Sequence, residues 1–175
     1  MSREEDVFIS LHERVAMANA WGADLFVSVH ANWSNSEKAR GFEVYFLSPE
    51  ASDADTRRLV REENKTDQGP IKSDILNILT DIQNTFHIQE SSRFAEFIYD
   101  HVSQLHTPSG KGVRQGPFTV LSGTSMPAVL FEIGFVSNTE DAQNLRNHRY
   151  LRSLTNAISS GIFDFVLRNQ DRHTS

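Results

Sequence analysis

The chain has 175 residues, of which 38% are hydrophobic, and it carries a formal net charge of −6. This acidic balance, with its scattered basic residues, argues against a nucleic-acid binder, and the absence of cysteine excludes a disulfide scaffold, a thiolate metal site and a cysteine nucleophile. No apolar run approaches the roughly 20 residues that cross a bilayer, so we expect one globular domain without a membrane span.

The first predicted element is a helix that starts at Leu11. Ser10 and Glu13 have the spacing of a capping box, in which each side chain bonds the other residue's backbone N–H. Apolar residues then recur at helical spacing from Leu11 to Ala18, and Gly22 can end the helix.

Two strands are predicted to follow this helix. Residues 25–30 (LFVSVH) are almost continuously apolar, as expected of a strand covered on both faces. Residues 42–47 (FEVYFL) form a second run between Gly41 and Ser48-Pro49. A helix followed by strands favours a layered α/β fold.

The segment from about residue 51 to residue 106 is predicted to be mainly helical, and it is longer than a strand crossover requires. Ser52 and Asp55 can cap a charged helix that ends near Asn64, residues 66–70 break it, and an isoleucine-rich stripe spans residues 71–82. A further helix is expected from Ser91 or Ser92, with these residues facing inward: Phe94, Phe97, Ile98, Val102 and Leu105. We interpret the segment as an insertion.

The last third of the chain is predicted to return to the sheet. A turn-rich loop over residues 108–117 precedes short strands at residues 118–121 and 127–132. Asn138 can cap one helix, and a final helix is expected over about residues 149–167. We expect a single domain over residues 1–168 and a disordered tail over residues 169–175.

His30 ends the first apolar run, where ligands collect in open α/β sheets. Ala31 leaves room beside it, and Asn32 offers a hydrogen-bonding side chain. An imidazole at this position can be a metal ligand or can be satisfied by a backbone carbonyl, and both interpretations stay open.

Glu132 ends the most hydrophobic run of the chain. Burying a carboxylate there costs several kcal/mol unless it is paired, protonated or near a metal. The residue is therefore either a strand-end glutamate turned to water or a functional group. Beside a metal ion it would serve as a general base.

No other catalytic pattern is present in the sequence. The remaining six histidines lack compact metal-ligand spacing, and no serine occupies a nucleophile elbow. The glycines of GKGVRQG lack the strand-then-helix setting of a phosphate-binding loop, so this stretch is predicted to be a surface turn.

Three segments taken together resemble a known family. DVFISLHERVAMANAWGADLFVSVHAN, GFEVYFLS and MPAVLFEIGFVSN are similar, in order and spacing, to the zinc-dependent N-acetylmuramoyl-L-alanine amidases of bacterial cell walls, cell-division type. The resemblance implies an α/β fold with a mixed, mostly parallel sheet and helices on both faces. It also implies that this chain lacks the family's first strand and helix, so that the domain is N-terminally truncated.

The resemblance implies one zinc ion, held in the family by a His–Glu–His set. His30 matches the second histidine ligand and Glu132 matches the catalytic glutamate. The family's first histidine and its glutamate ligand precede the segment at which this chain begins, so the zinc site is expected to be incomplete here. The implied reaction is hydrolysis of the amide bond between N-acetylmuramic acid and L-alanine of the stem peptide, with zinc-activated water and Glu132 as general base.

The helical insertion also has a counterpart in cell-division members of the family. There an inserted helix covers the active site, and its glutamate blocks the zinc until an activator protein moves it. Glu63, or with less support Glu62, matches that glutamate in this chain. The alternative is that both are solvated residues on a charged helix.

Two other functions compete with the enzyme. The chain could be an inactive fragment or remnant that acts only as a binding module, or an unrelated metallopeptidase that matches the segments by accident. The family resemblance implies peptidoglycan as substrate and a periplasmic or extracellular location, although no signal peptide begins the sequence.

Overall fold

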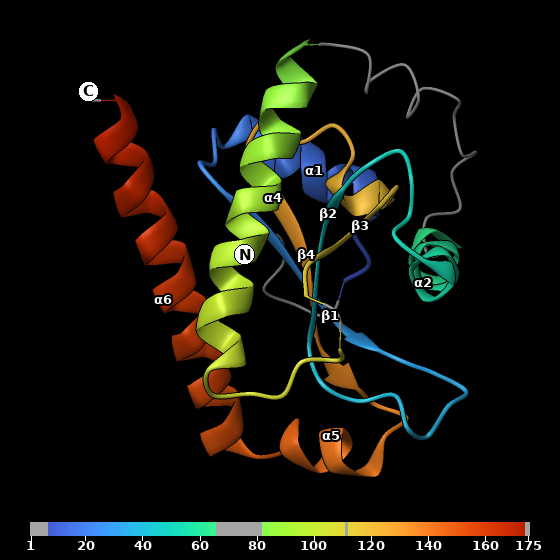
Figure 1. Ribbon diagram of the computed structural model, residues 1–175. Helices are drawn as coiled ribbons and strands as arrows, with labels where there is room; N and C mark the ends of the chain where they lie inside the picture. The colour runs from blue at the N-terminus through green and yellow to red at the C-terminus, as the bar shows by residue number, and fades with distance from the viewer. Residues whose placement is uncertain (1–6, 66–81, 111, 174–175) are drawn as a thin grey trace. The chain divides into compact units, whose positions relative to one another are not determined.

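The computed structural model describes residues 7–65, 82–110 and 112–173 (Figure 1). The elements in chain order are α1 (Leu11–Ala20), β1 (Phe26–Asn32), β2 (Glu43–Leu47), α2 (Ala54–Lys65), α4 (Ile82–Ser103), β3 (Arg114–Gly116), the 3-10 helix η1 (Thr119–Leu121), β4 (Ala128–Phe135), α5 (Thr139–Asn144) and α6 (His148–His173). The stripe predicted over residues 71–82 lies, apart from the helical Ile82, outside the described residues.

The described strands form a four-stranded sheet in the order β1-β4-β2-β3. β2 and β3 are parallel, with Tyr45 opposite Arg114 and Leu47 opposite Gly116. A mostly parallel sheet combined with helices confirms the predicted α/β class. Within the described ranges, no helix combines the length and the apolar character that a membrane span requires.

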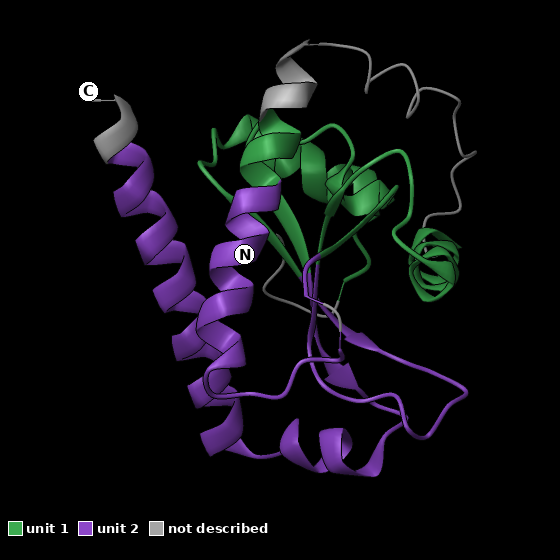
Figure 2. Ribbon diagram, viewed as in Figure 1, with its two compact units in different colours: residues 1–28, 45–91, 114–130 green, residues 29–44, 92–113, 131–175 purple. Residues whose placement is uncertain are grey.

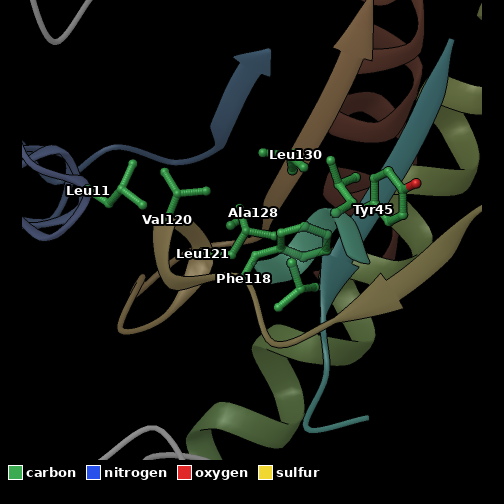
Figure 3. Close-up of a cluster of buried hydrophobic side chains, with 9 residues drawn as sticks. Leu11, Tyr45, Phe118, Val120, Leu121, Ala128 and Leu130 are labelled. Carbon is green, nitrogen blue, oxygen red and sulfur yellow. The ribbon is translucent and has the colours of Figure 1, made fainter. Parts of the chain in front are cut away.

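The chain divides into two compact units (Figure 2). Unit 1 contains residues 1–28, 45–91 and 114–130. Its buried hydrophobic cluster (Figure 3) gathers side chains from α1, α2, β2, η1 and β4, namely Leu11, Tyr45, Leu59, Val60, Phe118, Val120, Leu121, Ala128 and Leu130. The ring of Tyr45 packs on that of Phe118 at 5.1 Å between centroids, so aromatic contacts join β2 to the segment before η1.

Unit 2 contains residues 29–44, 92–113 and 131–175. Its helices α4 and α6 pack against each other through Phe94 and Phe165, whose ring centroids lie 4.9 Å apart. The contact is close because Gly161 has no side chain: a Cβ there would lie 2.8 Å from the carbonyl oxygen of Phe97. On the sheet, the ring of Phe42 stacks on that of Phe131 of β4.

The predicted start of α1 is confirmed. The hydroxyl of Ser10 accepts the backbone N–H of Glu13, and the carboxylate of Glu13 accepts the N–H of Ser10, so both halves of the capping box form. Leu11, Val15 and Ala18 are buried as expected.

Two predictions for the segment between α4 and β4 are wrong. Residues 118–121, expected to be a strand, contain the 3-10 helix η1, because the amide of Asn64 at the end of α2 accepts the backbone N–H of Thr119. The stretch expected to be a surface turn contains β3, which pairs with β2 and in which Arg114 is buried.

Further details of the helices and strands differ from prediction. α4 begins at Ile82 rather than at Ser91 or Ser92, and α6 continues to His173. The cap of α2 is Asp53, whose carboxylate accepts the N–H of Thr56, because Ser52 bonds the backbone of β3 instead. Two side chains expected inside are exposed: Leu105 is 67% exposed and Val29 is 58% exposed.

Candidate metal centre

His30 lies near the end of β1 and is half-buried. Successive side chains of a strand alternate between its faces, so His30 shares a face with Ser28 and Asn32, both of which are buried. This alternation points the imidazole toward the interior, while the side chain of Val29 is largely exposed on the other face.

Glu132 lies in β4 and has no exposed surface. A ring nitrogen of His30 and a carboxylate oxygen of Glu132 lie within 4.8 Å of each other, and both residues belong to unit 2. Imidazole nitrogen and carboxylate oxygen are ligands that zinc favours in proteins. The structure thus brings together the two residues that the sequence singled out, and burial of Glu132 excludes the alternative of a glutamate turned to water.

A second buried carboxylate, that of Glu43, is not among the residues that the sequence singled out. Glu43 of β2 is 5% exposed, and its carboxylate accepts a 2.8 Å hydrogen bond from the side-chain amide of Asn32. A charged residue inside the apolar run FEVYFL was the available signal. It was overlooked because a single glutamate in a strand can equally face water.

Asp141 holds the end of β4 in place. Its carboxylate accepts the backbone N–H groups of Phe135 and of Gly41, both at 2.8 Å, which ties β4 to the segment that enters β2. Gly134 fits this arrangement because its φ is +141° and a Cβ there would lie 3.1 Å from a carboxylate oxygen of Asp141. The positions that follow Glu132 are therefore constrained by backbone geometry.

Glu63 lies on α2, in unit 1. Its neighbour Asn64 fixes this end of the helix, because the amide group donates to the carbonyl of Pro117 and accepts from the N–H of Thr119. Glu62 is exposed and forms an ion pair with Lys65 at 3.0 Å. Glu63, in contrast, is half-buried, which distinguishes it from the solvated glutamate beside it.

Unit 2 also contains a cavity of about 380 Å³ beside the start of α6. His106, in its wall, is buried; a ring nitrogen contacts the Ser153 hydroxyl at 3.1 Å, and its ring meets that of Tyr150 edge-on. Burial lowers the pKa of His106, and the bond to Ser153 opposes this. Burial and the charges of Asp141 and Glu140 raise the pKa of Tyr150.

The chain matches the family model described as N-acetylmuramoyl-L-alanine amidase over residues 1–164. Among curated proteins, it is 32% identical to the N-acetylmuramoyl-L-alanine amidase AmiA of Salmonella typhimurium over 183 residues, which covers 99% of this chain and 63% of AmiA. It is also 35% identical to the Bacillus subtilis protein YqiI, with 92% of this chain and 60% of YqiI covered. The chain therefore spans less than two thirds of the length of these relatives.

Solved structures agree on the fold. The amidase from Clostridium difficile 630 superposes with a TM-score of 0.67 at 23% identity, covering 94% of this chain and 69% of that one. The Clostridioides difficile CwlD amidase, solved in complex with the GerS lipoprotein, superposes with a TM-score of 0.63 at 18% identity, covering 94% of this chain and 73% of that one. The family match over nearly the whole chain and the identity to AmiA show that this chain belongs to the N-acetylmuramoyl-L-alanine amidase family.

Proposed function

We propose that this chain hydrolyses the amide bond between N-acetylmuramic acid and the L-alanine of peptidoglycan stem peptides, with His30 as a zinc ligand and Glu132 as general base. The observation that carries the proposal is a fully buried carboxylate within 4.8 Å of an imidazole, in a chain of the amidase family.

The residues fit a zinc ion on chemical grounds. A buried carboxylate is costly unless a positive charge, a hydrogen bond or a proton compensates it. A divalent cation held by His30 would supply that charge beside Glu132. When bound, zinc supplies the Lewis acidity that polarises the scissile carbonyl.

The chain's own contribution to the reaction is proton transfer and orientation. The carboxylate of Glu132 accepts a proton from the attacking water and passes it to the leaving amine of L-alanine, so one residue acts first as base and then as acid. Its burial keeps bulk water away, and the bonds that Asp141 accepts from Phe135 and Gly41 fix the end of the strand that carries it.

We further propose that Glu63 is autoinhibitory. Its carboxylate is half-buried on α2, unlike that of its solvated neighbour Glu62. A carboxylate in the open zinc position would exclude the substrate, so hydrolysis would stay slow until a partner favours the open state. The CwlD–GerS complex supports a protein partner for this family. The substrate implies a periplasmic or extracellular location and a role in cell-wall turnover, including cell division.

Incubation of the purified chain with zinc and peptidoglycan sacculi tests the activity. We expect release of stem peptides with a free L-alanine amine, detected by mass spectrometry. Glu132→Gln keeps the shape but cannot accept the proton, so its rate should fall about 100-fold or more. Binding to sacculi without any product from the unmodified chain or from Glu63→Gln would contradict the proposal and would favour the alternative of a binding module.

The same assay tests autoinhibition. Glu63→Gln weakens the carboxylate's hold on a metal, so the basal hydrolysis rate should rise several-fold relative to the unmodified chain. Glu62→Gln is the matched control, because Glu62 is exposed and paired with Lys65, and its rate should not change. An equal response of the two variants would contradict the role of Glu63.

A further inference from the structure

A buried hydrogen bond joins the two strands that flank β4. The side-chain amide of Asn32 in β1 donates to the carboxylate of Glu43 in β2 at 2.8 Å, with exposed fractions of 3% and 5%. In the sheet order β1-β4-β2, the strand that carries Glu132 lies between them (Figure 1). The bond therefore spans the middle strand.

The alternation of side chains places the bond on the face that carries the candidate metal centre. The rings of Phe42 and Phe131 stack on one face of the sheet. The residue that follows each of them, Glu43 in β2 and Glu132 in β4, therefore points to the opposite face. On β1, His30 and Asn32 are two positions apart and share a face. The contacts within 4.8 Å between His30 and Glu132 and at 2.8 Å between Asn32 and Glu43 agree with this assignment.

Asn32 fixes the end of β1 in two further ways. Its side-chain oxygen accepts the backbone N–H of Trp33 at 2.7 Å, and its backbone carbonyl accepts the N–H of Val136 at 2.8 Å. The amide thus has a defined orientation, with its oxygen toward the backbone and its nitrogen toward Glu43. The carboxylate of Glu43 is the acceptor that selects this orientation.

We propose that Glu43 is a positioning residue that acts through Asn32 to hold His30 at the correct distance from Glu132. The inference rests on the proposed function of His30 as zinc ligand. Hydrogen-bonding partners outside the ligand set orient metal ligands, and their loss commonly weakens metal binding 10–100-fold. In this chain Glu43 does not bond the imidazole of His30 directly. It bonds Asn32, which lies two residues further along β1.

Zinc affinity, measured by competition with a chromogenic chelator, tests the proposal. Glu43→Ala and Asn32→Ala should each weaken zinc binding about tenfold, and the double variant should be no weaker than either single variant because both remove one interaction. Glu43→Gln retains an acceptor oxygen and should bind zinc within about threefold of the unmodified chain. Asn19→Ala, which removes an asparagine bonded to Gly123 and Ser125 in unit 1, is the matched control and should leave zinc affinity unchanged.

A second measurement does not depend on zinc. In the metal-free chain, nuclear Overhauser contacts between the His30 ring and the Glu132 side chain should be present in the unmodified protein and in Glu43→Gln, and lost in Glu43→Ala. If the unmodified chain binds no zinc, the metal assignment fails while this readout still decides the positioning role. Retention of both the contacts and the zinc affinity in Glu43→Ala, with only a lower melting temperature, would overturn the proposal.

Discussion

At the scale of single residues, His106 makes folding sensitive to pH. Burial lowers its pKa below the usual 6.5, so the folded chain binds this proton less readily than the unfolded chain. The contribution of neutral His106 to stability is therefore fully present above pH 6.5. It is lost as the pH falls from 6.5 through the lowered pKa of the folded state. His106→Gln should reduce the loss of stability between pH 7 and pH 5.5, measured by urea unfolding at both values.

The control for this prediction is His148→Gln, because His148 is exposed at the start of α6. That variant should keep the pH dependence of the unmodified chain. If His106→Gln and the unmodified chain lose the same free energy of unfolding between the two pH values, His106 is not responsible.

The candidate site was predicted from the sequence only in part, and the reason is visible residue by residue. His30 and Glu132 could be predicted because each ends an apolar run, where a group able to do chemistry stands out. Asp141 lies in the first turn of α5, where an acidic residue is common, but its carboxylate also accepts the backbone N–H groups of Gly41 and Phe135. A contact between residues a hundred positions apart, such as Gly41 and Asp141, leaves no pattern in the sequence around either residue.

At the scale of elements, the packing of α4 on α6 depends on Gly161. A Cβ at this position would lie 2.9 Å from the Cα of Ile98 and 2.8 Å from the carbonyl oxygen of Phe97, both backbone atoms that cannot rotate away. Gly161→Ala should therefore destabilise the chain by about 1–3 kcal/mol, although alanine favours a helix. Urea unfolding measures the change.

Ser160, the residue before Gly161, provides the control substitution. Ser160 is exposed on α6, so Ser160→Ala should change the free energy of unfolding by no more than about 0.5 kcal/mol. A Gly161→Ala variant as stable as Ser160→Ala would show that the two helices can separate without cost.

Two short elements show where sequence patterns are insufficient to predict secondary structure. The apolar run at residues 118–121 is too short for periodicity to distinguish strand from helix, and bonds from Asn64 on α2 determine that it becomes η1. β3 has a polar, glycine-rich sequence, and its strand character comes from pairing with β2 and from the bonds between Ser52 and Gln115. Long, strongly patterned segments such as α1 and β4 were predicted because their own residues determine them.

At the scale of the whole molecule, the family is established over nearly the full chain, while the chain spans 63% of the length of AmiA. Hydrolysis by this chain therefore depends on whether the described residues themselves bind metal. We propose that they do, with His30 as a zinc ligand beside Glu132.

The most direct test is zinc affinity of the unmodified chain, His30→Ala and His148→Ala, measured by isothermal titration calorimetry. We predict one zinc ion per unmodified chain, unchanged binding in the exposed-histidine control, and at least tenfold weaker binding in His30→Ala. Equal zinc affinity in the unmodified chain and in His30→Ala, or no zinc binding by the folded unmodified chain, would contradict the account.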